Sequence, residues 1–189
     1  MRLTLFPKQN NGWHVTLYVS CHGITTRSIP YEDKLFEIAL DFVNHQVVIS
    51  CSTGATESFP LAGQSVASFY TQLMAALRAL GIEVSIKAQP YDVPFSDIPF
   101  AQDTQHASYD PVAIKQYWQI LVFVNTTFEL FRGSFVGKST PVHLFWHHAD
   151  LALIRFSGKS APQFMGGSKA DQEAYSHEVI SFGFWMGDA

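Results

Sequence analysis

Apolar and polar residues alternate along much of the first third of the chain, which is typical of short strands with one buried face. In residues 13–20 the apolar positions are Trp13, Val15, Leu17 and Val19. Further strands are expected over residues 24–29, 36–42, 47–50, 56–59 and 82–86. Because the turns between the first five of these strands are short, we expect an antiparallel meander.

Two long helices follow from a different periodicity. After Ser65, a suitable N-cap, apolar residues fall on one helical face over residues 66–80, and Gly81 stands where a helix commonly ends. Asp110 followed by proline predicts a second helix over residues 111–132. The two helices and the meander predict an α+β fold in a single domain.

The remaining segments are less regular. Residues 88–108 hold three prolines and no periodicity, so we expect a loop packed over the core. Ser168 and Asp171 have the spacing of a capping box, which predicts a last helix to about Ile180.

Residues 142–156 predict a β-hairpin near the centre of the fold, turning at residues 147–150. With this turn, Leu144 faces Leu153, and both faces of the hairpin are apolar. A hairpin buried on both faces takes His143 and Arg155 out of water. A buried arginine needs a carboxylate or a bound anion, and Asp103, Asp150 and Glu178 are the candidates. The alternative is a structural ion pair with one satisfied core histidine.

Composition narrows the classes of partner. The chain has 189 residues, 47% of them hydrophobic, and a formal charge of −4, so we expect neither nucleic acid nor a membrane as partner. Only 15% of residues are charged, which is low for a globular protein. A low charge is compatible with a surface that is covered by another chain. Two cysteines without CxxC spacing, and no secretory signal, favour a cytoplasmic location.

Three chemical motifs are incomplete. His143 and His147 are about 13 Å apart on a strand, too far to share one metal ion, although His147, His148 and Asp150 could still meet His177 or His106. The sequence GSFVGKS is one residue short of a phosphate-binding loop and follows a helix. The pair His177-Glu178 lacks the second histidine of a zinc protease. We therefore expect no metal site, and no cofactor is indicated.

Four blocks of the chain resemble a bacterial family of uncharacterised proteins, a domain of unknown function. They are NNGWHVTLYVSCHGITT, IPFAQDTQHASYDP, FRGSFVGKSTPVHLFWHHADLALIRFSGKSAP and AYSHEVISFGFW. The family's polar positions are matched here by Asp103, His106, Tyr109, Asp110, Arg132, Lys138, His143, Asp150, Arg155, His177 and Glu178. The family pattern has glycine where this chain has His147, and its members extend further, so the chain resembles a copy shortened at both ends.

Two classes of function fit these residues. In the first, a small-molecule site that could be enzymatic, an anionic ligand is bound by Arg132, Lys138, Arg155, Asp103 and His106. Protons are then handled by His143, or by His177 with Glu178. In the second, the chain is a non-catalytic scaffold or interaction domain, which could pair with a second copy. A metal-dependent hydrolase is the third option.

Overall fold

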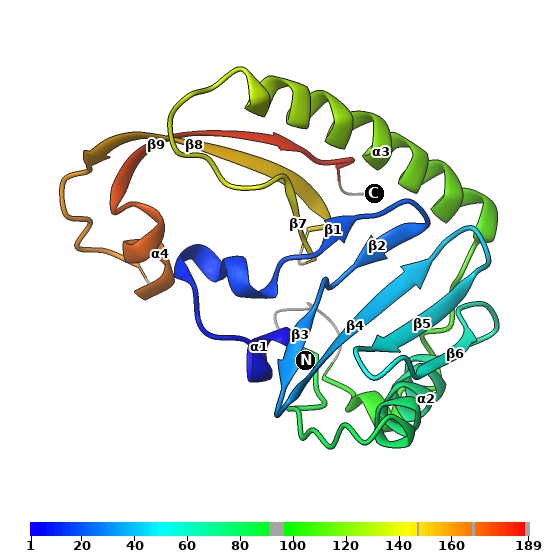
Figure 1. Cartoon of the computed structure of the whole chain (residues 1–189). Helices are drawn as coiled ribbons and strands as arrows, with labels where there is room; N and C mark the ends of the chain where they lie inside the picture. Colours follow the sequence, from blue (N-terminus) through cyan, green and yellow to red (C-terminus); the bar gives the residue numbers. More distant parts are fainter. Residues whose placement is uncertain (91–96, 147, 168, 188–189) are drawn as a thin grey trace.

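The computed structural model describes residues 1–90, 97–146, 148–167 and 169–187. Its helices and antiparallel sheets confirm the α+β class (Figure 1). The strands are divided between two sheets, and the predicted hairpin belongs to the second.

The first sheet is a meander in the order β1-β2-β4-β5-β6, with β3 also paired to β4. Its strands are β1 (Tyr18–Val19), β2 (Gly23–Thr25), β3 (Ile29–Tyr31), β4 (Lys34–Asp41), β5 (Gln46–Cys51) and β6 (Thr56–Pro60). Turn residues join them locally. Asp41 accepts hydrogen bonds from the amides of Val43 at 2.9 Å and Asn44 at 2.8 Å, which closes the turn between β4 and β5.

The second sheet contains β7 (His143–Phe145), β8 (Asp150–Ser160) and β9 (His177–Phe184) in that order. It meets the first sheet where Leu17 and Leu144 exchange backbone hydrogen bonds of 2.9 and 2.8 Å. Side chains alternate along a strand, so Leu151 and Leu153 of β8 point to one face and Ala152 and Ile154 to the other.

The helices begin where the sequence predicts. The first long helix, α2 (Val66–Ala79), starts at Ser65, whose hydroxyl accepts from the amide of Ser68 at 3.2 Å. The second, α3 (Pro111–Gly133), starts at Asp110, whose carboxylate accepts from two amides at 2.8 and 3.0 Å. Shorter turns are α1 (Arg2–Leu5), α4 (Lys169–Ala174) and the 3-10 segments Asn10–Val15 and Phe100–Gln102. In the described ranges no helix is both long and apolar enough to cross a membrane.

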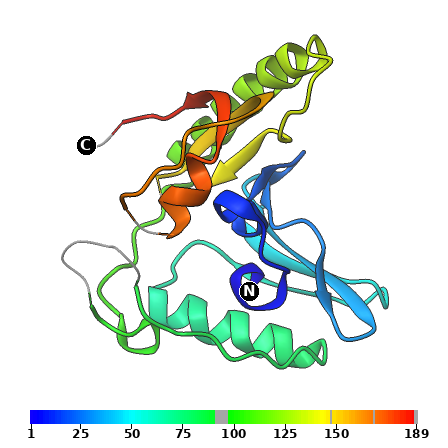
Figure 2. The ribbon, with the colours of Figure 1, turned by 90° about the vertical axis from the view of Figure 1, so that its left-hand side faces the viewer.

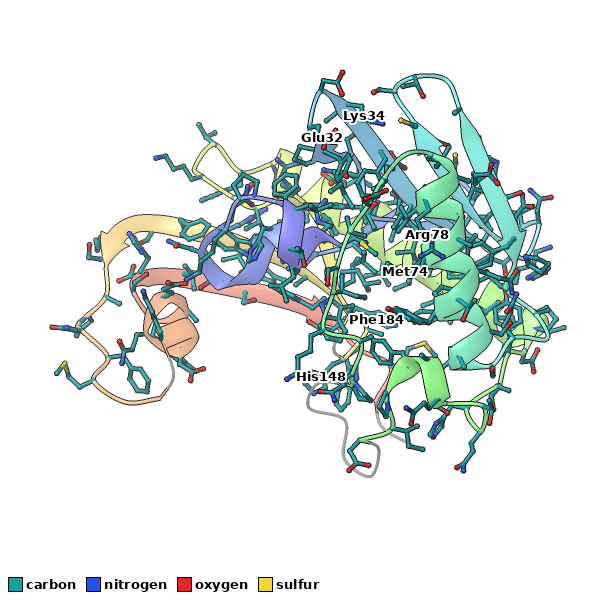
Figure 3. The ribbon with its side chains drawn as sticks, turned by 90° about the horizontal axis from the view of Figure 1, so that it is seen from below. Glu32, Lys34, Met74, Arg78, His148 and Phe184 are labelled. Atoms are coloured by element: carbon teal, nitrogen blue, oxygen red, sulfur yellow. The ribbon has the colours of Figure 1, made fainter. Side chains whose placement is uncertain are left out.

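One apolar core joins the two sheets and both long helices. It includes Ile29 from the first sheet, Leu153 from the second, Leu77 from α2 and Leu121 from α3, each fully buried. Figure 3 shows α2 from below, with Met74 and Arg78 on it. Met74 packs against the core, whereas Arg78 is exposed.

Three predicted strands differ from the structure. The strand predicted at residues 24–29 is divided between β2 and β3. Residues 82–86 form no strand, and the strand predicted at residues 13–20 is reduced to β1. Residues 13–15 belong instead to the segment Asn10–Val15, which is kinked at Asn11 and Gly12. Both kink residues have left-handed backbones, with φ of 56° and 67°, which Asn and Gly tolerate best.

The prediction of a last helix to Ile180 is wrong. The helix α4 ends at Ala174, and His177–Phe184 forms β9, paired with β8 along most of its length. Strand-forming residues such as Val179 and Phe182 gain ladder bonds and packing there, which outweigh a local helical preference. The proposed N-cap, Ser168, lies outside the described residues.

The hairpin is present with a different register. Leu144 pairs with Leu151 rather than Leu153, and the last pair of the hairpin is Phe145 with Asp150. A shift of two residues keeps each side chain on its predicted face, because strand side chains repeat every two residues. His143 therefore shares a face with Ala152 and Ile154, as the sequence predicts.

Candidate functional site

An open cavity of about 1080 Å³ lies on one face of the second sheet. Its walls come from β7, β8, β9, the segment Asn10–Val15 and α4. Helix α3 covers the opposite face of the same sheet (Figures 1 and 2). The volume is near the upper end of the range, roughly 300–1,000 Å³, that is typical of small-molecule sites.

His143 is a deeply buried polar residue of the cavity wall, with 1% of its surface exposed. Its Nδ1 atom lies 2.8 Å from the carbonyl oxygen of Pro141, and its Nε2 atom is buried without a hydrogen-bond partner. Burial lowers the pKa of this imidazole below its usual 6.5, although the Pro141 carbonyl and the Asp150 carboxylate both oppose the shift. The ring is therefore neutral at pH 7.

The tautomer of His143 follows from its partner. A carbonyl oxygen only accepts hydrogen bonds, so Nδ1 must carry the proton, and Nε2 of the neutral ring presents a lone pair. The wall of the cavity therefore contains a nitrogen that can accept a hydrogen bond or take up a proton.

The kinked segment Asn10–Val15 supplies two more residues with an unpartnered polar atom to the cavity wall. Asn11 Oδ1 and Trp13 Nε1 are both buried, and neither has a hydrogen-bond partner in the described structure. The Trp13 ring stands edge-on to the ring of Phe156, with centroids 5.9 Å apart. The sequence analysis did not select Asn11 or Trp13, although the Asn-Asn-Gly turn signal at residues 10–12 marks their position.

Two other predicted site residues line the cavity. Lys138 comes from the segment after α3, and His177 is the first residue of β9, with its Nδ1 atom 2.9 Å from the Ser176 hydroxyl. Glu178 follows His177 on the strand, so its side chain points to the other side and is not part of the cavity wall. The structure thus separates the two members of the predicted His-Glu pair.

The two predicted arginines lie on the α3 side of the sheet. The Arg155 guanidinium donates to the backbone carbonyl oxygen of Phe131. It also stacks on the side-chain ring of Phe131, with Arg155 Cζ 3.5 Å from the ring centroid. It therefore caps the carboxyl end of α3. Arg132 donates to the Ser139 hydroxyl at 3.2 Å and pairs with Glu129 at 3.1 Å. In the described ranges Arg155 forms no ion pair with a carboxylate.

Asp103 and His106 form a separate cluster at the start of α2. The Asp103 carboxylate accepts from the amides of Gln105 and His106 and lies 2.8 Å from His106 Nδ1. The hydrogen bond from the His106 amide, followed by the other bonds, lowers the pKa of Asp103. The carbonyls of both residues accept from the first amides of α2, at Ala67 and Val66. Their hydrogen bonds anchor this loop to the helix.

No group of three potential metal ligands occurs among the described His, Cys, Asp and Glu residues. The predicted alternative on His147 falls outside those residues. His148 is described, and its ring lies 6.5 Å from that of Trp185, measured between centroids.

The described residues form an α+β protein with an open cavity on its three-stranded sheet. The chain belongs to a family of unknown function, DUF5996, whose model matches residues 1–189. This confirms the resemblance seen in the sequence. No curated protein and no solved structure matches the chain.

Proposed function

We propose that the protein binds a small molecule in the cavity on the second sheet. One observation carries this proposal: of the four buried, unpartnered side-chain polar atoms in the described residues, three belong to residues that line the cavity, and the fourth is Arg155 Nε. The three atoms belong to Asn11, Trp13 and His143. A buried polar atom without a partner costs about 1–3 kcal/mol, so three around one cavity favour a site completed by a ligand.

Two charged or titratable groups give this site its chemistry. Lys138 is the predicted ligand-binding cation on the wall, and it would pair with an anionic group near the edge of the ligand. His143, neutral and with its Nε2 lone pair unpartnered, would accept a hydrogen bond from the ligand or act as a base toward it. Arg132, Arg155, Asp103 and His106 lie elsewhere and have local partners, so the proposal does not use them.

Thermal unfolding with a ligand panel tests the proposal. The panel should contain sugars, polyols, hydroxy acids, nucleosides and inorganic anions. A ligand at about 100 times its dissociation constant adds roughly 2.7 kcal/mol to the free energy of unfolding. We expect a saturable rise in Tm with at least one class.

The matched variants are His143→Leu, which removes the unpartnered nitrogen, and His22→Gln, at an exposed histidine outside the cavity. The ligand response should disappear in the first and persist in the second. A wild-type protein that is indifferent to the whole panel contradicts the proposal, as does a response unchanged in His143→Leu.

A second candidate function, self-association, is favoured by the outer face of α3. Phe123 and Leu130 are 73% and 75% exposed, and Val112 is 65% exposed. Between Pro111 and Phe128 the helix carries one charged residue, Lys115. A second copy could bring the same uncharged, apolar face against it by two-fold symmetry.

Light scattering of the purified chain tests this second candidate. We expect a dimer that dissociates on Phe123→Lys, with Val136→Lys as the control because Val136 is fully exposed and lies outside the helix. A wild-type monomer at high protein concentration would exclude it.

A further inference from the structure

The helix α3 has an inner face that packs on the core and an outer face that is exposed to solvent. Ile114, Leu121 and Phe128 belong to the inner face. The outer face carries exposed, uncharged residues at alternating intervals of three and four positions: Ala113, Gln116, Ile120, Phe123, Thr127 and Leu130. Figure 1 shows α3 along the outer edge of the molecule. We call these six residues the outer seam, because this spacing is typical of a helix that pairs with a second helix.

The hydroxyl groups on this side of α3 are satisfied within the helix itself. Thr126 Oγ1 donates to the carbonyl oxygen of Val122 at 2.8 Å, and Thr127 Oγ1 donates to that of Phe123 at 3.0 Å. A polar group that already has a partner costs little when it is taken out of water. The outer seam can therefore be covered by another surface without leaving either hydroxyl unpaired.

A second copy of α3 fits the outer seam best when it runs in the opposite direction. In an antiparallel pair of helices, each end of one seam lies beside the opposite end of the other. The pairs that then meet are Phe123 with Ile120, Leu130 with Ala113, and Thr127 with Gln116. Large side chains lie opposite smaller ones, and the two polar positions lie opposite each other, which favours close packing. A parallel pair would instead place each residue against its own copy.

The charges along α3 favour the same orientation. Lys115 forms no ion pair in the described ranges, and Glu129 is paired with Arg132 of its own helix at 3.1 Å. An antiparallel copy brings Lys115 close to the level of its Glu129, whereas a parallel copy brings the two Lys115 side chains to one level. Anionic lipid is a poorer occupant, because it attracts basic clusters and residues 111–131 contain one basic residue.

We infer that the protein forms a two-fold dimer in which the outer seams of two α3 helices pack antiparallel, with the symmetry axis beside Leu121 and Val122. The inference rests on the second candidate function, self-association, and names its partner, orientation and register. From Ala113 to Leu130 the seam is about 25 Å long.

Cross-linking through introduced cysteines tests the orientation and register. Cys21 is exposed and Cys51 is buried, so all variants carry Cys21→Ser. The double variant Ala113→Cys/Leu130→Cys should form a covalent dimer under mild oxidation, because each new cysteine lies beside the other one of the second copy. Either single variant is the matched control and should stay uncross-linked, since its two cysteines would lie about 25 Å apart. Non-reducing gel electrophoresis measures both results.

The outcomes separate this inference from the second candidate function. Covalent dimers of the single variants overturn the antiparallel orientation and keep self-association through α3, because a parallel pair aligns equal positions. No cross-link in the double variant overturns the register, and self-association through α3 then stands only if Phe123→Lys still dissociates the wild-type dimer. A wild-type monomer at high protein concentration overturns both. Binding of that monomer to phosphatidylcholine vesicles, lost in Phe123→Lys, would assign the seam to a membrane surface instead.

Discussion

The two faces of the second sheet differ in the partners that their polar residues have. On the α3 side, Arg155 of β8 shares its guanidinium between a helix-terminal carbonyl and the ring of Phe131, and Leu153 is fully buried beside it. On the cavity side, one strand away, His143 is as deeply buried as Leu153 but has a nitrogen without a partner. Among the described residues, the α3 face therefore has one buried unpartnered atom, Arg155 Nε, whereas the residues that line the cavity have three.

The difference shows how a structural polar residue can be told from a candidate functional one. Burial does not distinguish them, because Asp103 is also buried, with 4% of its surface exposed. The distinction lies in the partners: Asp103 accepts from two amides and contacts His106, while His143 uses one of its two nitrogens. The following predictions address this contrast, from the largest expected effect to the smallest.

The largest effect should come from the α3 face. Leu153→Ala removes a fully buried side chain from the core and should lower the free energy of unfolding by about 2–5 kcal/mol. Urea denaturation measures this change. Ser181→Ala on β9, at an exposed position on the cavity side, is the control and should change it by less than about 0.5 kcal/mol. Similar losses in the two variants would contradict the contrast between the faces.

Arg155→Met should lower the free energy of unfolding by about 1–3 kcal/mol. The change removes a charged hydrogen bond to the end of α3 and a stacking contact with Phe131. The same variant should leave ligand binding in the cavity intact, because Arg155 lies on the other face. Loss of binding without loss of stability would instead support the sequence-based prediction of Arg155 as an anion-binding residue.

The free energy of unfolding should fall as the pH falls below about 6.5, and His143 should cause part of this fall. Burial lowers the pKa of this imidazole in the folded state, so below 6.5 the unfolded chain takes up the proton first. The contribution of His143 to the free energy of unfolding is complete above the pKa of this group in the unfolded chain. It declines as the pH falls toward the lower pKa of the folded chain. The charged or titratable groups of the cavity wall are Tyr18, Lys138, Asp171, Glu173, Tyr175 and His177, and Asp150 also acts on the ring.

Denaturation of wild type and His143→Leu at about pH 7.5 and 5.5 measures the part of the pH-dependent loss of stability that is due to His143. The variant should lose less stability between the two pH values than wild type does. Equal losses would show that His143 has the same pKa in the folded and unfolded chain.

The smallest change in stability should come from Trp13→Phe. The variant keeps a ring against Phe156 and removes an N–H that has no partner, so its free energy of unfolding should stay within about 1 kcal/mol of wild type. Thermal unfolding without ligand measures this. A loss of several kcal/mol would mean that the indole N–H has a structural partner in solution, and the cavity face would then resemble the α3 face.

Much of the fold could be predicted because its signals are local. The caps at Ser65 and Asp110 and the turn at Asp41 use side chains that bond to amides two or three residues away. The same kind of local reasoning failed at His177–Phe184. There a capping-box pattern predicted a helix, but the segment forms a strand because it pairs with β8 residues that lie 17 to 33 positions earlier in the chain.

The candidate site was predicted only in part for the same reason. The sequence selected Lys138, His143 and His177, which line the cavity, together with Arg132, Arg155, Asp103 and His106, which do not. It could not select Asn11 and Trp13, because their importance depends on a kinked segment packed across a strand more than 130 residues away.

By itself, the sequence determined the α+β class, the starts of both long helices, the turns on either side of β5 and the face of the hairpin on which His143 lies. Each depends on caps, turn residues or an alternation of period two, all of which act between near neighbours in the chain. Only the tertiary structure decided which polar groups acquired partners. That outcome depends on which distant segments pack together: α3 supplies an acceptor and an aromatic ring to Arg155, and the N-terminal segment and α4 leave the cavity beside His143 open.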